Sequence, residues 1–192
     1  MGTLIKQIRD DRQVRDVLEK SFDFMVTDAE SAQNIGWFRV EPQDRVGLIA
    51  SDASGGVFLL YGEAELLIYI SSEGQAGVVA NTLRQLLTIL VTYPYWSDLL
   101  KFSAGGKLEE MRSAVEPLEA QALDYAPHLD QHRRLLSSRL GLKRDPTVIS
   151  VLHAAVRDLG REVRIFGLDG SEFRSLFNKF EAARLRPPGR KP

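Results

Sequence analysis

The sequence of 192 residues contains no cysteine. This absence excludes disulfides, thiolate metal ligands, iron–sulfur clusters and a cysteine nucleophile. A chain without cysteine suits a reducing compartment, and we expect a cytoplasmic protein. The sequence therefore excludes enzyme classes whose chemistry requires a cysteine thiolate.

Long apolar runs and a strong excess of one charge are also missing. No apolar stretch approaches the roughly 18 residues of a membrane-spanning helix, and residues 1–19 carry charges where a signal peptide is apolar. The chain has 25 basic and 26 acidic residues, so it lacks the basic field of a typical nucleic-acid-binding protein. We expect neither a membrane nor a nucleic acid as partner, and the sequence leaves the oligomeric state open.

Residues 36–71 show the pattern of β-strands. Glycine-containing spacers at 52–56 and 62–64 are too short for a parallel crossover, so the strands predict an antiparallel meander. Two of the strands are apolar on both faces, so the sheet must be covered on both sides, by helices of this chain or by a partner. The expected strands are Trp37–Val40, Val46–Ser51, Val57–Tyr61 and Glu65–Ile70.

Helical spacing of apolar residues dominates the rest of the chain. The predicted fold class is α+β, an antiparallel meander sheet flanked by helices with a mainly helical C-terminal extension. We expect an α+β core at 1–104, an extension packed on it at 105–183, and a disordered basic tail at 184–192. The expected helices are 3–22, one capped by Asn81 and ending near Pro94, 108–118 and beyond with Pro117 as a possible kink, 129–140, one from Asp145 to Gly160, and one from Ser171 through Phe180; a strand is expected at 162–166.

Four features carry a family resemblance over residues 34–100. They are Gly36-Trp37-Phe38, the segment Ile49–Gly56, the two hydrophobic strands that follow, and the leucine-rich helix of residues 82–90. Together they resemble the SUKH superfamily. The resemblance implies an α+β fold and a bacterial immunity protein that binds a cognate toxin domain and blocks it, without a cofactor. The superfamily also has regulatory or scaffold members outside toxin systems, and that alternative stays open.

A partner-binding surface is expected at the sheet, its turns and the exit of the leucine-rich helix. Aspartate and serine in the 52–56 turn can present polar groups, and tyrosine and tryptophan are the usual anchors of interfaces. The alternative interpretations are an ordinary turn closed by Asp52 and aromatic residues that only fill the core. The predicted partner-binding residues are Asp52, Ser54, Glu73, Tyr93, Tyr95 and Trp96.

An enzymatic alternative depends on two histidines four residues apart. His128 and His132 share a helix face, a spacing that metal sites use, and His153 is the remaining imidazole. The glutamate that a zinc hydrolase uses as base is missing between them, and two arginines follow. We therefore expect surface histidines, no catalytic residue, no metal and no cofactor, with a metal-assisted hydrolase as the alternative.

Overall fold

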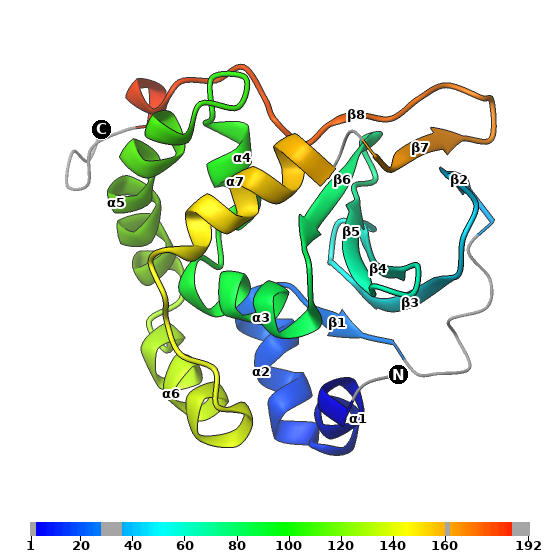
Figure 1. Cartoon of the computed structure of the whole chain (residues 1–192). Coiled ribbons are helices and arrows are strands. Elements are labelled where there is room, and N and C mark those ends of the chain that lie inside the picture. The colour runs from blue at the N-terminus through cyan, green and yellow to red at the C-terminus, as the bar shows by residue number, and fades with distance from the viewer. Residues whose placement is uncertain (1–2, 28–35, 160–161, 186–192) are drawn as a thin grey trace.

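The computed structural model describes residues 3–27, 36–159 and 162–185. Within these ranges the chain is α+β, with most of its strands in one largely antiparallel sheet (Figure 1). The helices are α1 Thr3–Asp10, α2 Arg12–Phe22, α3 Leu83–Thr92, α4 Trp96–Lys101, α5 Leu108–Tyr125, α6 Leu129–Leu140, α7 Val148–Asp158 and the 3₁₀ helix η3 Ala182–Arg184. The strands are β1 Met25–Val26, β2 Phe38–Glu41, β3 Val46–Ser51, β4 Val57–Tyr61, β5 Leu66–Ile70, β6 Gln75–Ala80, β7 Arg164–Gly167 and β8 Arg174–Ser175.

The main sheet has the order β1-β3-β4-β5-β6-β8. Its neighbours pair antiparallel except β6 and β8, which pair parallel. The predicted meander is confirmed for β3, β4 and β5, with β3 and β4 at the predicted bounds. Strand β6 was not predicted, because its small residues Ala76 and Gly77 follow a serine-rich turn and dilute the strand pattern.

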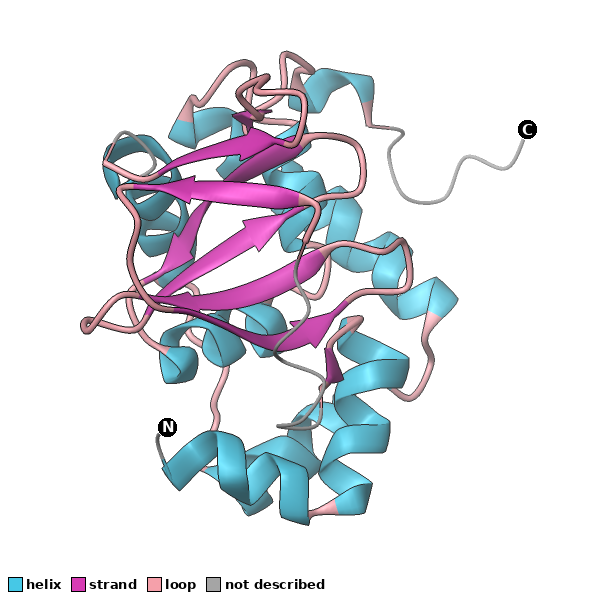
Figure 2. Cartoon of the chain, turned by 90° about the vertical axis from the view of Figure 1, so that its right-hand side faces the viewer, coloured by secondary structure: helices cyan, strands magenta, loops and turns pink. Residues whose placement is uncertain are grey.

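Both faces of the meander are covered by this chain itself. One face, with Phe58, Leu67 and Tyr69, packs into the large hydrophobic cluster that the helices complete. The other face, with Leu59 and Ile68, packs in a second cluster with residues of β2 and β7. Figures 1 and 2 show the helices gathered on one side of the strands. The sheet faces are therefore core, and the part of the predicted surface that used them is not available for docking.

Strands β2 and β7 form a separate two-stranded antiparallel sheet, so the first predicted strand does not belong to the meander. Val40 pairs with Ile165 in this ribbon, and both side chains are buried in the second cluster. The large cluster likewise contains side chains from both sides of the predicted boundary at residue 104. Segments far apart in the sequence thus share each core.

The N-terminal boundaries or capping residues of three helices differ from the predicted ones. The predicted first helix is two helices, because the Asp11 carboxylate accepts the Val14 N–H at 3.1 Å and caps α2. Helix α3 is capped by Thr82, which accepts from Gln85 N–H, rather than by Asn81. Helix α7 begins at Val148, three residues after Asp145.

The predicted last helix is wrong. Residues 173–180 are extended and contribute β8, which lies beside β6; the Arg174 N–H donates to the Gly74 carbonyl at 2.9 Å. The apolar residues of this segment divide between the two clusters, Phe173 on one side and Leu176 on the other. Pairing with the free edge of β6 therefore overrides the helical spacing. Of the predicted tail, Arg184 lies in η3, and residues 186–192 lie outside the described ranges.

A buried arginine ties three helices together. Arg133 of α6 donates to the carbonyls of Val91 and Thr92 at the end of α3, at 2.9 and 3.2 Å. It also donates to both carboxylate oxygens of Glu119 on α5, at 2.8 and 3.1 Å. Burial alone would raise the pKa of Glu119, but the hydrogen bonds and charge of Arg133 outweigh it and lower the pKa. The arginine both caps α3 and fixes its neighbours.

We expect Arg133→Met to destabilise the fold by about 3–5 kcal/mol, because it leaves two helix carbonyls without their donor and removes two of the hydrogen bonds that Glu119 accepts. Chemical denaturation followed by tryptophan fluorescence measures the free energy of unfolding. Arg134→Met, at the exposed neighbouring position, is the matched control and should change it by no more than about 0.5 kcal/mol. Similar losses for both variants would contradict the role assigned to Arg133.

Candidate functional site: a pocket at the end of the sheet

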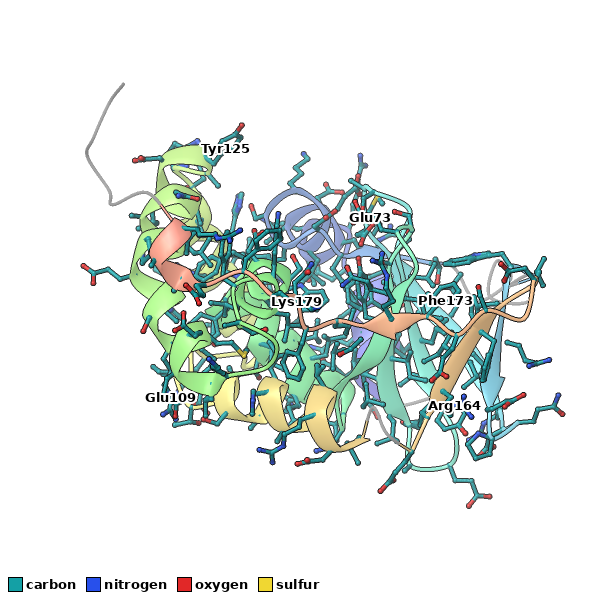
Figure 3. All side chains as sticks on the ribbon, turned by 90° about the horizontal axis from the view of Figure 1, so that it is seen from above. Glu73, Glu109, Tyr125, Arg164, Phe173 and Lys179 are labelled. Atoms are coloured by element: carbon teal, nitrogen blue, oxygen red, sulfur yellow. The ribbon has the colours of Figure 1, made fainter. Side chains whose placement is uncertain are left out.

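Two hairpin turns, helix α4 and the segment after β8 enclose a cavity of about 240 Å³ at one end of the sheet. We call it the sheet-end pocket. Figure 3 shows the segment that carries Phe173 and Lys179 passing the turn that carries Glu73. The exposed residues of its rim are Ser54, Ser72, Glu73, Ser97 and Lys101; Ser71, Gln75, Asp98 and Asn178 are half-buried; Tyr69, Trp96, Leu100 and Leu176 are buried and form its base.

The turn between β3 and β4 is closed by a buried aspartate. One carboxylate oxygen of Asp52 accepts hydrogen bonds from Ser54 N–H, Ser54 Oγ and Gly56 N–H, at 2.7 to 2.9 Å. The other accepts from the Tyr69 hydroxyl at 2.6 Å. Burial, and then this contact with Asp52, raises the pKa of Tyr69, so the hydroxyl stays protonated and keeps donating. The network fixes the turn to β5 and sets the position of the rim.

The base of the pocket is a rigid aromatic group. The rings of Tyr69 and Trp96 stand perpendicular with centroids 5.0 Å apart, and Phe58 lies 4.9 Å from Tyr69. All three side chains are at least nine-tenths buried. Because the base is fixed by packing, the polar rim is held in place before any ligand arrives.

Asp98 is the unusual ionisable group of the pocket. Burial raises its pKa, and the charge of Lys101 opposes that shift only in part. No hydrogen bond reaches its carboxylate from the residues that the structure describes. A half-buried carboxylate without donors, beside a cavity, is the kind of group that functional sites contain.

The structure brings three of the six predicted residues together in the sheet-end pocket, namely Ser54, Glu73 and Trp96. Asp52 lies directly behind them, since it accepts from both Ser54 and Tyr69. The interpretation of Asp52 as the residue that closes a turn therefore fits its contacts, and its place in the site is to position Ser54.

Tyr93 and Tyr95 lie elsewhere, in the core. Their side chains are 4% and 7% exposed, and their hydroxyls donate to Pro146 O and to the Glu119 carboxylate at 3.0 Å each. The alternative interpretation, that they fill the core, fits this placement. Their role in partner binding stays a prediction, and neither belongs to the candidate site.

Most lining residues were missed by sequence reasoning, and Asp98, Lys101, Leu176 and Asn178 are the ones that matter most for the site. Asp98 and Lys101 follow Trp96 on the short helix α4, and their proximity to the aromatic cluster was the one available signal. Leu176 and Asn178 were assigned to a helix, so nothing in the sequence placed them near the turns.

The histidines contact other groups. His132 Nδ1 lies 2.6 Å from Ser21 Oγ, and the rings of His128 and His132 are 6.4 Å apart. His153 is buried, with Nε2 2.7 Å from Gly106 O. Throughout the described ranges there is no group of three or more His, Asp or Glu that could hold a metal ion. Within the described ranges, therefore, no third ligand joins His128 and His132 in the metal site that the hydrolase alternative requires.

Comparisons with protein-family models, with curated proteins and with solved structures found no match for this chain. None of the helices in the described part of the chain combines the length and apolar character needed to cross a membrane. What the fold and the site define is an α+β protein with a polar pocket at the end of its sheet.

Gly56→Ala should destabilise the protein by about 2–3 kcal/mol. A Cβ at this position would fall against Asp52 Oδ2 and 2.5 Å from the Tyr69 hydroxyl, so the network behind the pocket would have to open. Gly47→Ala, in β3, meets nothing within 4 Å and is the control. Thermal and urea unfolding measure the stability of the two variants. Equal stability of Gly56→Ala and Gly47→Ala would contradict the close packing at Gly56.

Asp98→Asn should raise the free energy of unfolding near neutral pH. The pKa of Asp98 is higher in the folded than in the unfolded protein, so folding favours the protonated carboxyl group. The stabilisation from this group is therefore complete at a pH below the pKa of the unfolded state, and it is lost as the pH rises through the pKa of the folded state. The gain from the amide should therefore be larger at about pH 7 than at about pH 4. Glu73→Gln, at the exposed rim, serves as control, and a loss of stability in Asp98→Asn at neutral pH would contradict the assignment.

Proposed function

We propose that this chain is a cytoplasmic protein-binding module, an immunity protein that binds a cognate bacterial toxin domain and occludes it. The support is the SUKH-like pattern of residues 34–100 together with the sheet-end pocket. The observation that carries most weight is that Ser54, Glu73 and Trp96, selected from three separate segments, line one cavity. Inhibition by occlusion needs no cofactor and no reaction.

The architecture of the pocket suits an interface. Its rim is polar and exposed while its base is aromatic and fixed, and pre-ordered groups reduce the entropy lost on binding. Protein interfaces concentrate their binding energy in a few such central positions. A regulatory or scaffold module would use the same surface, and the nature of the partner distinguishes these two roles.

The test is to express the toxin domain encoded beside this gene with and without the chain, and to measure survival and binding. We expect rescue of growth and a stable complex. Glu73→Arg should weaken binding about tenfold or more, since it reverses a charge on the rim. Glu109→Arg, on α5 away from the pocket (Figure 3), is the matched control and should bind as wild type. Absence of binding by the wild-type protein would reject the proposal.

A further inference from the structure

The size of the sheet-end pocket points to a single side chain as its occupant. Its volume of about 240 Å³ lies below the roughly 300–1,000 Å³ of pockets that hold cofactors or drug-sized ligands. A cavity of this size that is open to the surface fits the end of one long side chain from a partner protein.

The charges of the lining favour a cation. Two carboxylates, Glu73 and Asp98, and one ammonium group, that of Lys101, line the pocket, while the Arg174 guanidinium outside the lining donates to the Glu73 carbonyl at 3.3 Å. Neither carboxylate forms an ion pair within 4.0 Å in the part of the chain that the structure describes. Asp98 is also half-buried, and partial burial makes its attraction for a cation stronger than that of a fully exposed carboxylate.

The uncharged groups of the pocket add hydrogen-bond acceptors. The Gln75 amide N–H donates to Ser175 O at 3.0 Å, which leaves its oxygen to accept. The hydroxyls of Ser72 and Ser97 lie on the rim and can accept as well. A ligand rich in donors and carrying a positive charge matches this set of groups.

Among protein side chains, arginine matches it best. Its guanidinium is planar, always charged and carries five N–H donors, and it binds carboxylates in pairs of hydrogen bonds. Arginine is also enriched among the residues that dominate interfaces. A lysine ammonium is a point charge and would duplicate what Lys101 already provides beside Asp98.

We propose that the sheet-end pocket binds one arginine side chain of the partner protein, with Asp98 as the inner acceptor and Glu73 as the acceptor on the rim. This inference rests on the proposed role in protein binding and specifies the chemistry that the partner must present. Lys101 lies on the rim and partly offsets the charge of Asp98. Its ammonium group therefore competes with the incoming guanidinium for this carboxylate.

The pocket can be tested without any partner. The full chain, labelled with ¹⁵N, is titrated with N-acetyl-arginine-N-methylamide and followed by NMR, with the citrulline analogue as the neutral control of the same shape. We expect millimolar binding, a range of affinity suited to one side chain, with shifts confined to the signals of Trp96, Lys101 and the 71–75 turn. Equal shifts with the citrulline analogue, or shifts elsewhere only, would overturn the inference.

Three variants assign the roles. Asp98→Asn should abolish the shifts caused by the arginine probe, and Glu73→Gln should weaken binding severalfold. Lys101→Met should strengthen binding severalfold, because it removes the competing cation, and this gain would not arise from a damaged fold. Asp124→Asn, at an exposed position of α5, is the control for loss of one negative charge. Unchanged binding in Asp98→Asn would overturn the inference.

The same variants separate this inference from the proposed function. If the toxin domain binds Asp98→Asn as well as wild type and the probe is silent, the arginine pocket is rejected while the immunity role stands. If the probe binds through Asp98 and the toxin domain does not bind, the immunity role is rejected while the pocket stands.

Discussion

The two-sided apolar character of β4 and β5 is the constraint on which the rest of this structure depends. Alternate residues such as Phe58 and Leu59 point to opposite faces, and both are buried. A sheet with two apolar faces is stable in water only if each face is covered. Helices cover one face and the β2–β7 ribbon covers the other, which obliges the chain to return to the sheet after α7. That return also places β8 beside β6 and supplies Leu176 and Asn178 to the sheet-end pocket.

Asp98 differs from the paired charges of the core in how its carboxylate is satisfied. Arg133 and Glu119 show that charged groups in the core form ion pairs and hydrogen bonds with each other. The Asp98 carboxylate accepts no hydrogen bond from the described residues, although burial raises its pKa. Arg133 is buried and fully paired, whereas the half-buried Asp98 receives no donor from the described residues, and its raised pKa marks a cost in stability when it is ionised. Such a cost is typical of sites that await a ligand.

Local structure could be predicted from this sequence, and long-range pairing could not. Strands β3 and β4 and helix α6 follow from periodicity and turn residues within a few positions, and their bounds are confirmed. The pairings of β2 with β7 and of β6 with β8 join segments that lie far apart in the sequence, such as Phe38 with Gly167 and Gln75 with Arg174, and no local pattern encodes them. The segment after Ser171 shows the reason: its apolar spacing fits a helix equally well, and only the free edge of β6 decides for an extended chain. Of the site, Ser54 and Glu73 lie in recognisable turns, whereas the half-buried state of Asp98 is a property of the assembled fold.

The contacts of Ser54, Asp98 and Lys101 support the proposed role of the pocket in binding. The Ser54 hydroxyl donates to Asp52, so its proton is engaged in holding the turn and is not directed at a substrate. Lys101 lies close enough to Asp98 to oppose the rise of its pKa, yet no hydrogen bond joins the two side chains within the described ranges. An ammonium on a flexible stem leaves such a carboxylate partly unsatisfied, while a planar guanidinium satisfies both of its oxygens at once. The arginine that we propose as occupant would therefore satisfy Asp98 better than Lys101 does, and this difference in geometry is the basis of the specificity in our proposal.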